Sequence, residues 1–334
     1  MANASERRYF PFQAQPWTTL FWVWALWLPV IGLAQDKLLW RDPGRIETID
    51  FKHPAGGARN IPRPPFYFVE EDFGGTSPKV LVRDGAGVLW RVKSGYEIRA
   101  ECFATRMVAA LGYYAEPTVF MPGGKIVGVG RLKRAGNFIH QDGSFGNAAF
   151  ERRDSGLKYL GDRDWAWNDN PFIETRELKG LKLLVMLLSN WDNKDVRDRK
   201  LGSNTGILER RVDDAVQWIY FVNDWGQTLG SWGAELKPKG WDCAAFTQQT
   251  GHFIQGRAAR YVRFNFVGQH TDDFSDDITR SDVRWLLRYL SRITNKQIRS
   301  GLRASGASPE EIECFTIALR KRINALKRIA ASSK

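Results

Sequence analysis

Hydrophobic and polar positions alternate over residues 79–93, on both sides of a short turn that contains Gly85 and Gly87. This period of two predicts a strand, a tight turn and a second strand. Residues 97–111 place apolar side chains at helical spacing, and residues 113–129 alternate again around a Pro-Gly-Gly turn. The pattern predicts a small lobe of strands that holds one helix.

The second half of the chain shows longer apolar patterns. Residues 175–191 carry leucines and a valine on one helical face, which predicts a buried helix. Two apolar runs within residues 205–222 predict a two-stranded hairpin. From about residue 242 onward we expect mostly helices, with amphipathic segments at 284–293 and 308–329, the latter opened by a serine cap.

An uncharged apolar segment of eighteen residues, 17–34, follows two arginines and ends in small residues. These features fit a secretory signal peptide cleaved near Ala34, and Arg7-Arg8 loosely resembles a twin-arginine signal. An uncleaved membrane anchor over the same residues and an ordinary buried helix are the alternatives. Because positive charge precedes the segment, we expect the following domain to lie outside the cytoplasm, exported or anchored to a bacterial inner membrane.

These patterns divide the chain into four parts. Residues 1–35 are the signal peptide or anchor, and residues 36–75 are an irregular extension rich in proline and glycine. Residues 76–130 form the small β-rich lobe. Residues 131–334 form a larger, mainly helical lobe that opens with the irregular stretch 131–170. We therefore expect an α+β fold with two lobes.

The composition fits a well-packed domain with anionic partners. An apolar fraction of 43% and 14 tryptophans exclude a mainly disordered chain. A formal charge of +12 favours partners such as nucleotides, although a basic balance also accompanies export and solubility. Cys102, Cys243 and Cys314 form neither zinc-site pairs nor a dense disulfide framework. One disulfide is an alternative, and we expect none.

The sequence does not indicate metal chemistry based on histidine. The histidines are isolated, with no acidic or cysteine partner at ligand spacing: His53, His140, His252 and His270. The acidic residues at 272–277 are an alternative site for a divalent cation, but a solvated loop is the preferred interpretation. The basic residues of the last predicted helix fit a solvated face, so we expect no specific nucleic-acid binding.

A set of residues suited to phosphoryl transfer accompanies the first predicted strands. The turn at Gly85 and Gly87 offers close backbone approach to phosphates, and Lys93 on the next strand offers a cation. Glu101 lies inside the following helix, where it can pair with Lys93 and hold it toward the phosphates. Glu97, one turn earlier, is the alternative partner.

Two aspartates end apolar elements further along the chain. The predicted buried helix ends at Asp192, which can orient an attacking hydroxyl, and Lys194 can steady the transferred group. The predicted hairpin ends at Asp224, which begins the Asp-x-Gly arrangement whose aspartate binds the nucleotide's metal. Either aspartate alone fits a turn or a helix cap. It is the order of all these motifs that indicates phosphoryl transfer.

With these motifs the chain resembles the kinase-like superfamily, and within it the atypical bacterial branch of HipA-type and phosphatidylinositol-kinase-like proteins. It also resembles a group of exported bacterial proteins with sequences of the type NPF-x-x-TREL-x-GLK, NWD-x-KD and D-x-G, here residues 170–182, 190–195 and 224–226. The resemblance spans about residues 40–330. It implies a bilobal protein-kinase-like fold with ATP and Mg²⁺ or Mn²⁺ as cofactors.

The resemblance also implies roles for single residues. They are phosphate binding by Lys93, pairing with Lys93 by Glu101, base catalysis by Asp192 and metal binding by Asp224. Kinases place a metal-binding asparagine about five residues after the catalytic aspartate, where this chain has Arg197. Because the expected asparagine-then-strand pattern resumes at Asn204, we assign the second metal ligand to Asn204.

The sequence therefore predicts metal-dependent phosphoryl transfer from ATP to a hydroxyl of a protein, lipid or small molecule, by a monomer. A catalytically inactive pseudokinase that serves as an envelope scaffold or nucleotide-binding module is the alternative from another class. Transfer of the nucleotide moiety instead of phosphate is a third hypothesis. No segment of the sequence identifies the acceptor.

Overall fold

The computed structural model describes residues 36–332, except residues 76, 154–155, 214, 234–239, 259 and 272. The predicted signal peptide or anchor, residues 1–35, lies outside the described residues. Within the described part, none of the helices combines the length and apolar character needed to cross a bilayer.

Strands occupy both halves of the chain, and the longer helices follow one another in the second half. The strands are β1 (Asp36–Leu38), β2 (Phe66–Asp72), β3 (Lys79–Arg83), β4 (Leu89–Lys93), β5 (Thr118–Met121), β6 (Gly124–Val127), β7 (Ser144–Phe145), β8 (Ala148–Arg153), β9 (Leu157–Tyr159), β10 (Thr205–Val212), β11 (Ala215–Val222), β12 (Ile254–Ala258) and β13 (Tyr261–Phe264). The α-helices are α1 (Ile98–Ala110), α2 (Arg176–Leu187), α3 (Cys243–Thr250), α4 (Arg280–Leu290), α5 (Asn295–Ala304) and α6 (Pro309–Ala331). Short 3-10 helices are η1 (Ile46–Thr48), η2 (Ala58–Asn60), η3 (Ala135–Asn137) and η4 (Val196–Leu201).

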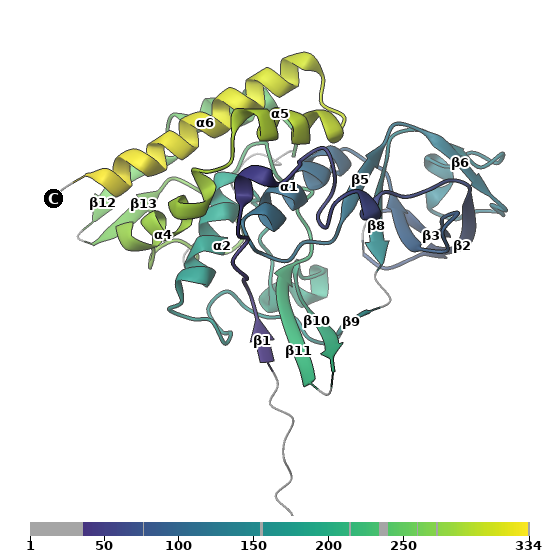
Figure 1. Ribbon diagram of the computed structural model, residues 1–334, viewed down its shortest axis with the longest axis horizontal. Coiled ribbons are helices and arrows are strands. Elements are labelled where there is room, and N and C mark those ends of the chain that lie inside the picture. Colours follow the sequence, from purple (N-terminus) through teal and green to yellow (C-terminus); the bar gives the residue numbers. More distant parts are fainter. Residues whose placement is uncertain are drawn as a thin grey trace, which may run out of the picture.

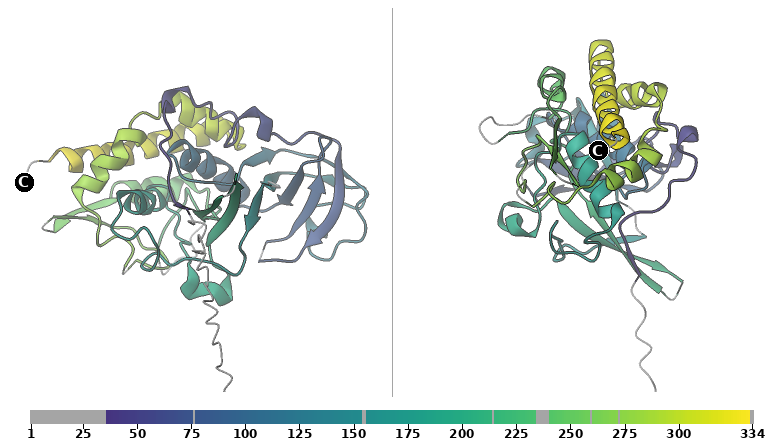
Figure 2. Two further views of the ribbon diagram at one scale, coloured as in Figure 1. Left: turned by 60° about the horizontal axis from the view of Figure 1, so that its bottom comes forward. Right: turned by 90° about the vertical axis from the view of Figure 1, so that its left-hand side faces the viewer.

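The molecule has two lobes, as the sequence predicts. Figure 1 shows the strands β2, β3, β5, β6 and β8 gathered at one end, α2 and α4 toward the other, and α1 and α5 between them, with α6 running from the helical end toward the middle. The left-hand view of Figure 2 shows the same separation. The predicted α+β class is confirmed.

The N-terminal lobe is built on a seven-stranded sheet with the order β5-β8-β4-β3-β2-β6-β7. Along β4 the side chains of Trp90 and Val92 are buried, while Arg91 and Lys93 point to the other face. This alternation follows from the period of two in a strand. The buried face packs against Phe150 and other apolar side chains of the lobe, so the opposite face is left for charged residues.

The boundaries of this lobe differ from the predicted ones. The predicted irregular extension, residues 36–75, contains β2, which pairs antiparallel with β3. The predicted irregular stretch, residues 131–170, contains β8, which lies between β4 and β5. Strand β2 directly follows prolines, and its aromatic residues were taken as part of the irregular extension. Strand β8 carries small and charged residues, so its local pattern is weak, and its place in the sheet comes from pairing with β4 and β5.

The C-terminal lobe is organised around α2. Thr175 caps this helix by accepting a hydrogen bond from Leu178 N, and every residue from Leu178 to Leu187 is buried. Helices α4 and α6 pack against it. The predicted Ser308 cap of α6 is confirmed, as part of a capping box with Glu311. The expectation of mostly helices after residue 242 is confirmed by α3 to α6, with the hairpin of β12 and β13 as the exception.

The hairpin predicted over residues 205–222 is confirmed as β10 and β11. Strand β1 pairs with β11 in parallel, and β9 pairs with β10, which gives a four-stranded sheet in the order β1-β11-β10-β9. Because the hairpin holds Thr205 opposite Val222, Asn204 and Asn223 lie next to each other at its open end. This end faces the other lobe.

One cysteine pair is oxidised, contrary to the expectation of none. Cys243, the first residue of α3, is bonded to Cys314 on α6, and Cys102 is a buried free thiol. The 71-residue separation hid the pair in the sequence, because it exists only once α3 packs on α6.

A buried arginine ties α6 to the end of α2. Arg322 is fully buried and donates hydrogen bonds to Leu187 O (3.0 Å), Ser189 Oγ (2.6 Å) and Thr250 Oγ1 (2.9 Å). Its guanidinium lies 3.7 Å from the centre of the Phe246 ring. Burial holds the pKa of Arg322 well below its usual value. The carbonyls at the C-terminal end of α2 offset part of this cost, because a helix favours cations there.

We predict that Arg322→Lys lowers the free energy of unfolding by about 3 kcal/mol. A lysine keeps the charge but cannot donate to all the acceptors that the planar guanidinium reaches, so buried oxygens lose their partners. Urea denaturation measures the change. Lys327→Ala, an exposed position on the same helix, is the control and should stay within about 0.5 kcal/mol of wild type. Equal stability of all three proteins would contradict the prediction.

We predict that Cys243→Ser/Cys314→Ser lowers the free energy of unfolding by about 4 kcal/mol. The physical reason is the larger entropy of an unfolded chain whose 71-residue loop is no longer closed. Chemical denaturation with and without dithiothreitol measures the effect. Dithiothreitol should destabilise the wild type by a similar amount and leave the double variant unchanged; an unaffected wild type would contradict the pairing.

Candidate active site

A polar cleft of about 370 Å³ lies where the two lobes meet. It is lined from the N-terminal lobe by the sheet and the loop between β2 and β3, and from the C-terminal lobe by the loops around α2 and the β10–β11 hairpin. Residues of the predicted site that line it are Lys93, Asp192, Lys194, Asn204 and Asp224. The fold therefore brings together residues that lie up to 131 positions apart in the sequence.

Lys93 is held at the roof of the cleft by two buried carboxylates. Its Nζ contacts Glu101 of α1 and lies 2.6 Å from Glu151 Oε1 of β8. Glu97, the alternative partner, instead accepts a hydrogen bond from Gln227. The structure thus places Glu101, not Glu97, against the lysine. Glu151 also pairs with Arg91, which stands directly opposite it in the β4–β8 ladder.

The two carboxylates respond differently to burial. Burial raises the pKa of Glu101 well above its usual value, despite the neighbouring Lys93. Burial acts in the same direction on Glu151, but Arg91 and Lys93 outweigh it and hold the pKa of Glu151 below its usual value. For Lys93, burial alone would lower the pKa, and the two glutamates raise it. The lysine is therefore a fixed cation, and of its two carboxylate partners Glu151 is the one whose pKa is held low.

The end of α2 positions the floor of the cleft. Asn190 is buried and donates a hydrogen bond to Asp224 O (3.0 Å), which fixes the two loops relative to each other. Asp192 follows, with Lys194 Nζ 3.3 Å from its Oδ1. Asn204 donates to Asp192 O at 2.6 Å and lines the cleft beside it. Burial raises the pKa of Asp192 above its usual value, although Lys194 acts against this.

Asp224 sits directly after β11, where the strand ends at the cleft. Its Oδ1 accepts a hydrogen bond from Gly226 N (2.8 Å). A side chain at Gly226 would collide with Glu97, since an added Cβ would lie 2.8 Å from Glu97 Cβ. Burial raises the pKa of Glu97, and the charge of Asp224 adds to the effect. Asp224 and Glu97 thus present neighbouring carboxylates to one cleft, a donor set that suits a hard divalent cation.

The predicted phosphate-covering turn does not line the cleft. Gly85 and Gly87 join β3 to β4 at the far end of the hairpin from Lys79 and Lys93. There the Asp84 carboxylate accepts hydrogen bonds from Ala86 N and Trp90 Nε1 and organises the turn, which is a structural role. The prediction failed because it started the sheet one strand too late.

The loop that does cover the cleft joins β2 to β3 and contains Gly74 and Gly75. Gly75 has φ of +64°, which favours glycine, and a Cβ added there would lie 3.2 Å from Lys79 Nζ. Arg134 donates to the carbonyl of Gly75 and to that of Phe73. The sequence signal was available, because FYFVEED and KVLVR flank two glycines as strands flank a turn.

Further residues of the cleft escaped the sequence analysis. The sheet face carries Lys79, Arg91 and Arg153 beside Lys93, and all four cations line the cleft. Arg153 pairs with Glu116. No local pattern marks these side chains as a group, because they come from three strands that are paired only in the folded sheet.

Arg197, at the position where kinases have a metal-binding asparagine, does not line the cleft. Its guanidinium binds Asp195 (Nη2 to Oδ2, 2.6 Å) and Asp273 (Nη1 to Oδ2, 2.5 Å). Of the acidic residues 273–277, Asp276 contacts Arg263 and Asp277 contacts Lys182.

Comparisons with known proteins give only weak matches. No family model matches the chain, and no curated protein matches it. Among solved structures, the Golgi casein kinase is similar with a TM-score of 0.35 and 11% identity, over 80% of this chain and 72% of that one. The same kinase with Mn/ADP bound gives 0.35 and 12%, over 80% and 73%. The Rio2 kinase–ADP/Mg²⁺–phosphoaspartate complex from Chaetomium thermophilum gives 0.29 and 11%, over 77% and 72%.

Because these TM-scores are below 0.5, the class of fold rests on the arrangement of the chain itself. A strand, a glycine loop, a strand and a lysine-bearing strand precede a helix whose glutamate binds that lysine. A loop aspartate and an Asp-x-Gly at a strand end face them across the cleft. This arrangement defines the bilobal kinase-like fold. The predicted fold class is confirmed.

We predict that Glu151→Gln destabilises the protein more than Glu101→Gln at pH 7. The folded state favours the charged form of Glu151 and penalises that of Glu101, so an amide at 151 removes a needed charge. The expected cost at 151 is about 3 kcal/mol in the free energy of unfolding. Glu70→Gln, at an exposed position of β2, is the control.

Urea denaturation measures the three variants. Since the pKa of Glu151 is depressed on folding, its contribution is present at pH 7 and is lost as the pH falls through the acidic range. The wild type and Glu151→Gln should therefore converge in stability toward low pH. A larger loss in Glu101→Gln would contradict the conclusion that the folded state favours the charge of Glu151 more than that of Glu101.

Proposed function

We propose that the chain is a phosphotransferase that moves the γ-phosphoryl group of ATP to a hydroxyl group. The observation that carries the proposal is the convergence of Lys93, Asp192, Asn204 and Asp224 on one cleft between the lobes. Each residue alone fits a structural role. Together they supply a fixed cation, a carboxylate with a raised pKa and oxygen ligands at one place.

The charged sheet face is the expected seat of the phosphates. Lys93 is kept charged by its glutamates, and Lys79, Arg91 and Arg153 surround it. The loop at Gly74 and Gly75 lies over this face, where glycine backbone can approach phosphate oxygens closely.

Asp192 is the proposed base. In the transfer, the acceptor oxygen forms a bond to the γ-phosphorus while the bond to the β–γ bridging oxygen breaks, and the acceptor's proton passes to Asp192. The raised pKa of Asp192 suits a group that must take up a proton. Lys194, 3.3 Å away, is placed to offset charge on the transferred group.

A divalent cation fits the oxygen donors of the cleft. Asp224 and Asn204 are the proposed ligands, with Glu97 near Asp224 as an additional carboxylate. Carboxylate and amide oxygens are the ligands that Mg²⁺ and Mn²⁺ prefer. When bound, such an ion would neutralise the charge of the nucleotide's phosphates.

The location and the branch of the family remain proposals as well. We propose export or anchoring through residues 17–34, as that sequence indicates. The Cys243–Cys314 disulfide supports an oxidising compartment, because cytosolic thiols are kept reduced. Membership of the HipA-type branch rests on the sequence motifs alone.

We predict Mg²⁺- or Mn²⁺-dependent release or transfer of ³²P from γ-labelled ATP by the full-length chain. Asp192→Ala and Asp224→Ala should each lower the rate at least about 100-fold, as expected for loss of a general base or a metal ligand. Asp162→Ala, at an exposed position of the same lobe, is the control and should keep the rate. An unchanged rate in both active-site variants would contradict the mechanism.

The same proteins separate the alternatives. A nucleotide-dependent rise in melting temperature without transfer would favour a pseudokinase that binds nucleotide. No shift with any metal would favour a scaffold. Mass spectrometry of the acceptor distinguishes an added phosphoryl group from an added nucleotide.

A further inference from the structure

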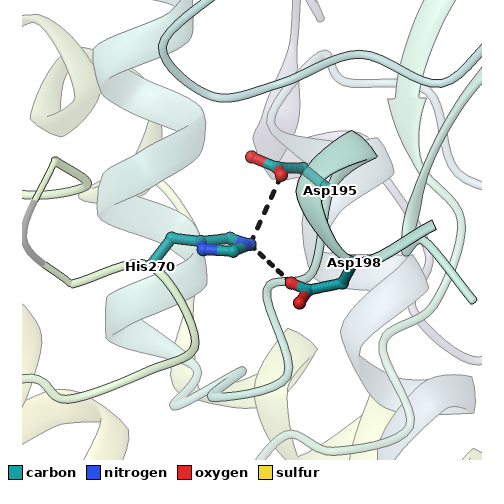
Figure 3. A group of neighbouring side chains, drawn as sticks. All are labelled: Asp195, Asp198 and His270. Carbon is teal, nitrogen blue, oxygen red and sulfur yellow. Dashed lines mark ion pairs between the residues drawn. The ribbon is translucent and has the colours of Figure 1, made fainter. Parts of the chain in front are cut away.

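A second group of possible metal ligands lies beneath the loop that carries Asp192. Asp195 is the residue before η4, and Asp198 lies within η4. His270 comes from a separate loop after β13. Figure 3 shows the imidazole pointing between the two carboxylates. His270 Nε2 lies 3.3 Å from Asp195 Oδ1 and 2.8 Å from Asp198 Oδ2. The sequence analysis took His270 as isolated because its partners are more than 70 positions away.

Two polar atoms of this cluster, one on His270 and one on Asp198, are buried and lack hydrogen-bond partners among the described residues. His270 is 8% exposed and Asp195 is fully buried. Within the described part of the chain, neither His270 Nε2 nor Asp198 Oδ2 makes a hydrogen bond. Buried polar atoms of this kind are costly unless a further partner satisfies them. A cation between the three side chains would be such a partner.

The charges of the cluster leave room for a divalent cation. Arg197 contacts both Asp195 and Asp273, whereas Asp198 contacts His270. Three carboxylates beside one guanidinium leave an excess of negative charge, which a divalent cation would neutralise. Asp195 accepts hydrogen bonds from Arg197 and from Trp167 N, which fix its carboxylate with Oδ1 toward His270.

The distances fit one ion. Two ligand atoms on a tetrahedral ion with bonds of about 2.0–2.1 Å are about 3.3 Å apart, which is the separation of His270 Nε2 and Asp195 Oδ1. Asp198 is the closer ligand and is partly exposed, so its side chain has space to adjust. One imidazole with two carboxylates suits Zn²⁺ better than Mg²⁺ or Ca²⁺, which prefer oxygen donors alone.

We propose that Asp195, Asp198 and His270 bind one divalent transition-metal ion, with Zn²⁺ as the best match, at a site separate from the nucleotide cleft. The ion joins η4 to the 268–270 segment. That segment already supports the loop of Asp192, because Gln269 N donates to Asn193 Oδ1 (2.7 Å) and to Trp191 O (3.1 Å). The role of the site is therefore structural: the ion would hold the loop that carries Asp192 in place.

The test uses the full-length chain without an affinity tag, stripped with a chelator, dialysed and titrated with ZnCl₂ in the absence of nucleotide. We expect one equivalent of Zn²⁺ to bind and to raise the melting temperature, with no such rise from MgCl₂. His270→Gln and Asp198→Asn should weaken binding by at least about 10–100-fold, the loss that outer-shell substitutions alone cause. Asp276→Asn, a neighbouring exposed acid paired with Arg263, is the matched control and should bind as wild type does.

Co²⁺ gives a second measurement on the same proteins. Its visible absorption should change on binding to the wild type and to Asp224→Asn, and should be lost in His270→Gln. If His270→Gln does not fold by circular dichroism, the partly exposed Asp198→Asn variant carries the comparison. The proposal is overturned if the wild type binds no Zn²⁺, if His270→Gln binds it unchanged, or if Asp224→Asn abolishes the binding.

Discussion

The kinase-like arrangement depends on keeping the buried side-chain ammonium group of Lys93 charged. Lys93 is removed from water at the junction of the lobes, and an isolated cation there would lose its proton rather than pay for desolvation. Glu101 and Glu151 prevent this, and they arrive from a helix and a strand that are separate in sequence. The position of α1 against the sheet is thereby linked to the charge of the cleft.

Because Lys93 must stay charged, Glu151 of β8 is needed as well as Glu101 of α1. In the β4–β8 pairing, Glu151 lies opposite Arg91. Lys93 lies opposite Ala149, which is two residues before Glu151 on β8. One carboxylate therefore serves two cations on a single sheet face, and its pKa stays low. Glu101 pairs with Lys93 and is close to the charges of Glu151 and Asp224, so burial raises its pKa well above the usual value. The roof of the cleft is rigid because a shift of any of these strands would leave a buried charge unpaired.

Sequence reasoning succeeded where a local pattern decides the structure. The α1, α2 and α6 helices and the β3–β4 and β10–β11 hairpins follow from periodicity and capping, and the motifs at Asp192 and Asp224 follow from those elements. It failed where distant pairing decides. Glu151 and His270 show no local signal, since their importance lies in contacts made across the fold. The glycine turn was misplaced for a different reason, because the aromatic strand β2 follows prolines and was assigned to the irregular extension, although it pairs with the neighbouring β3.

The floor of the cleft is held by polar contacts, whereas its roof and its supporting helix are held by charge and packing. The loop from Asn190 to Asn204 buries little apolar surface of its own, and hydrogen bonds from Trp167, Gln269 and Asn190 fix it. Arg322 binds the end of α2 immediately before it. Polar networks of this kind are specific only when every member is satisfied. Among the described residues, His270 Nε2 and Asp198 Oδ2 lack hydrogen-bond partners, and an ion bound there would add contacts to the network that positions Asp192.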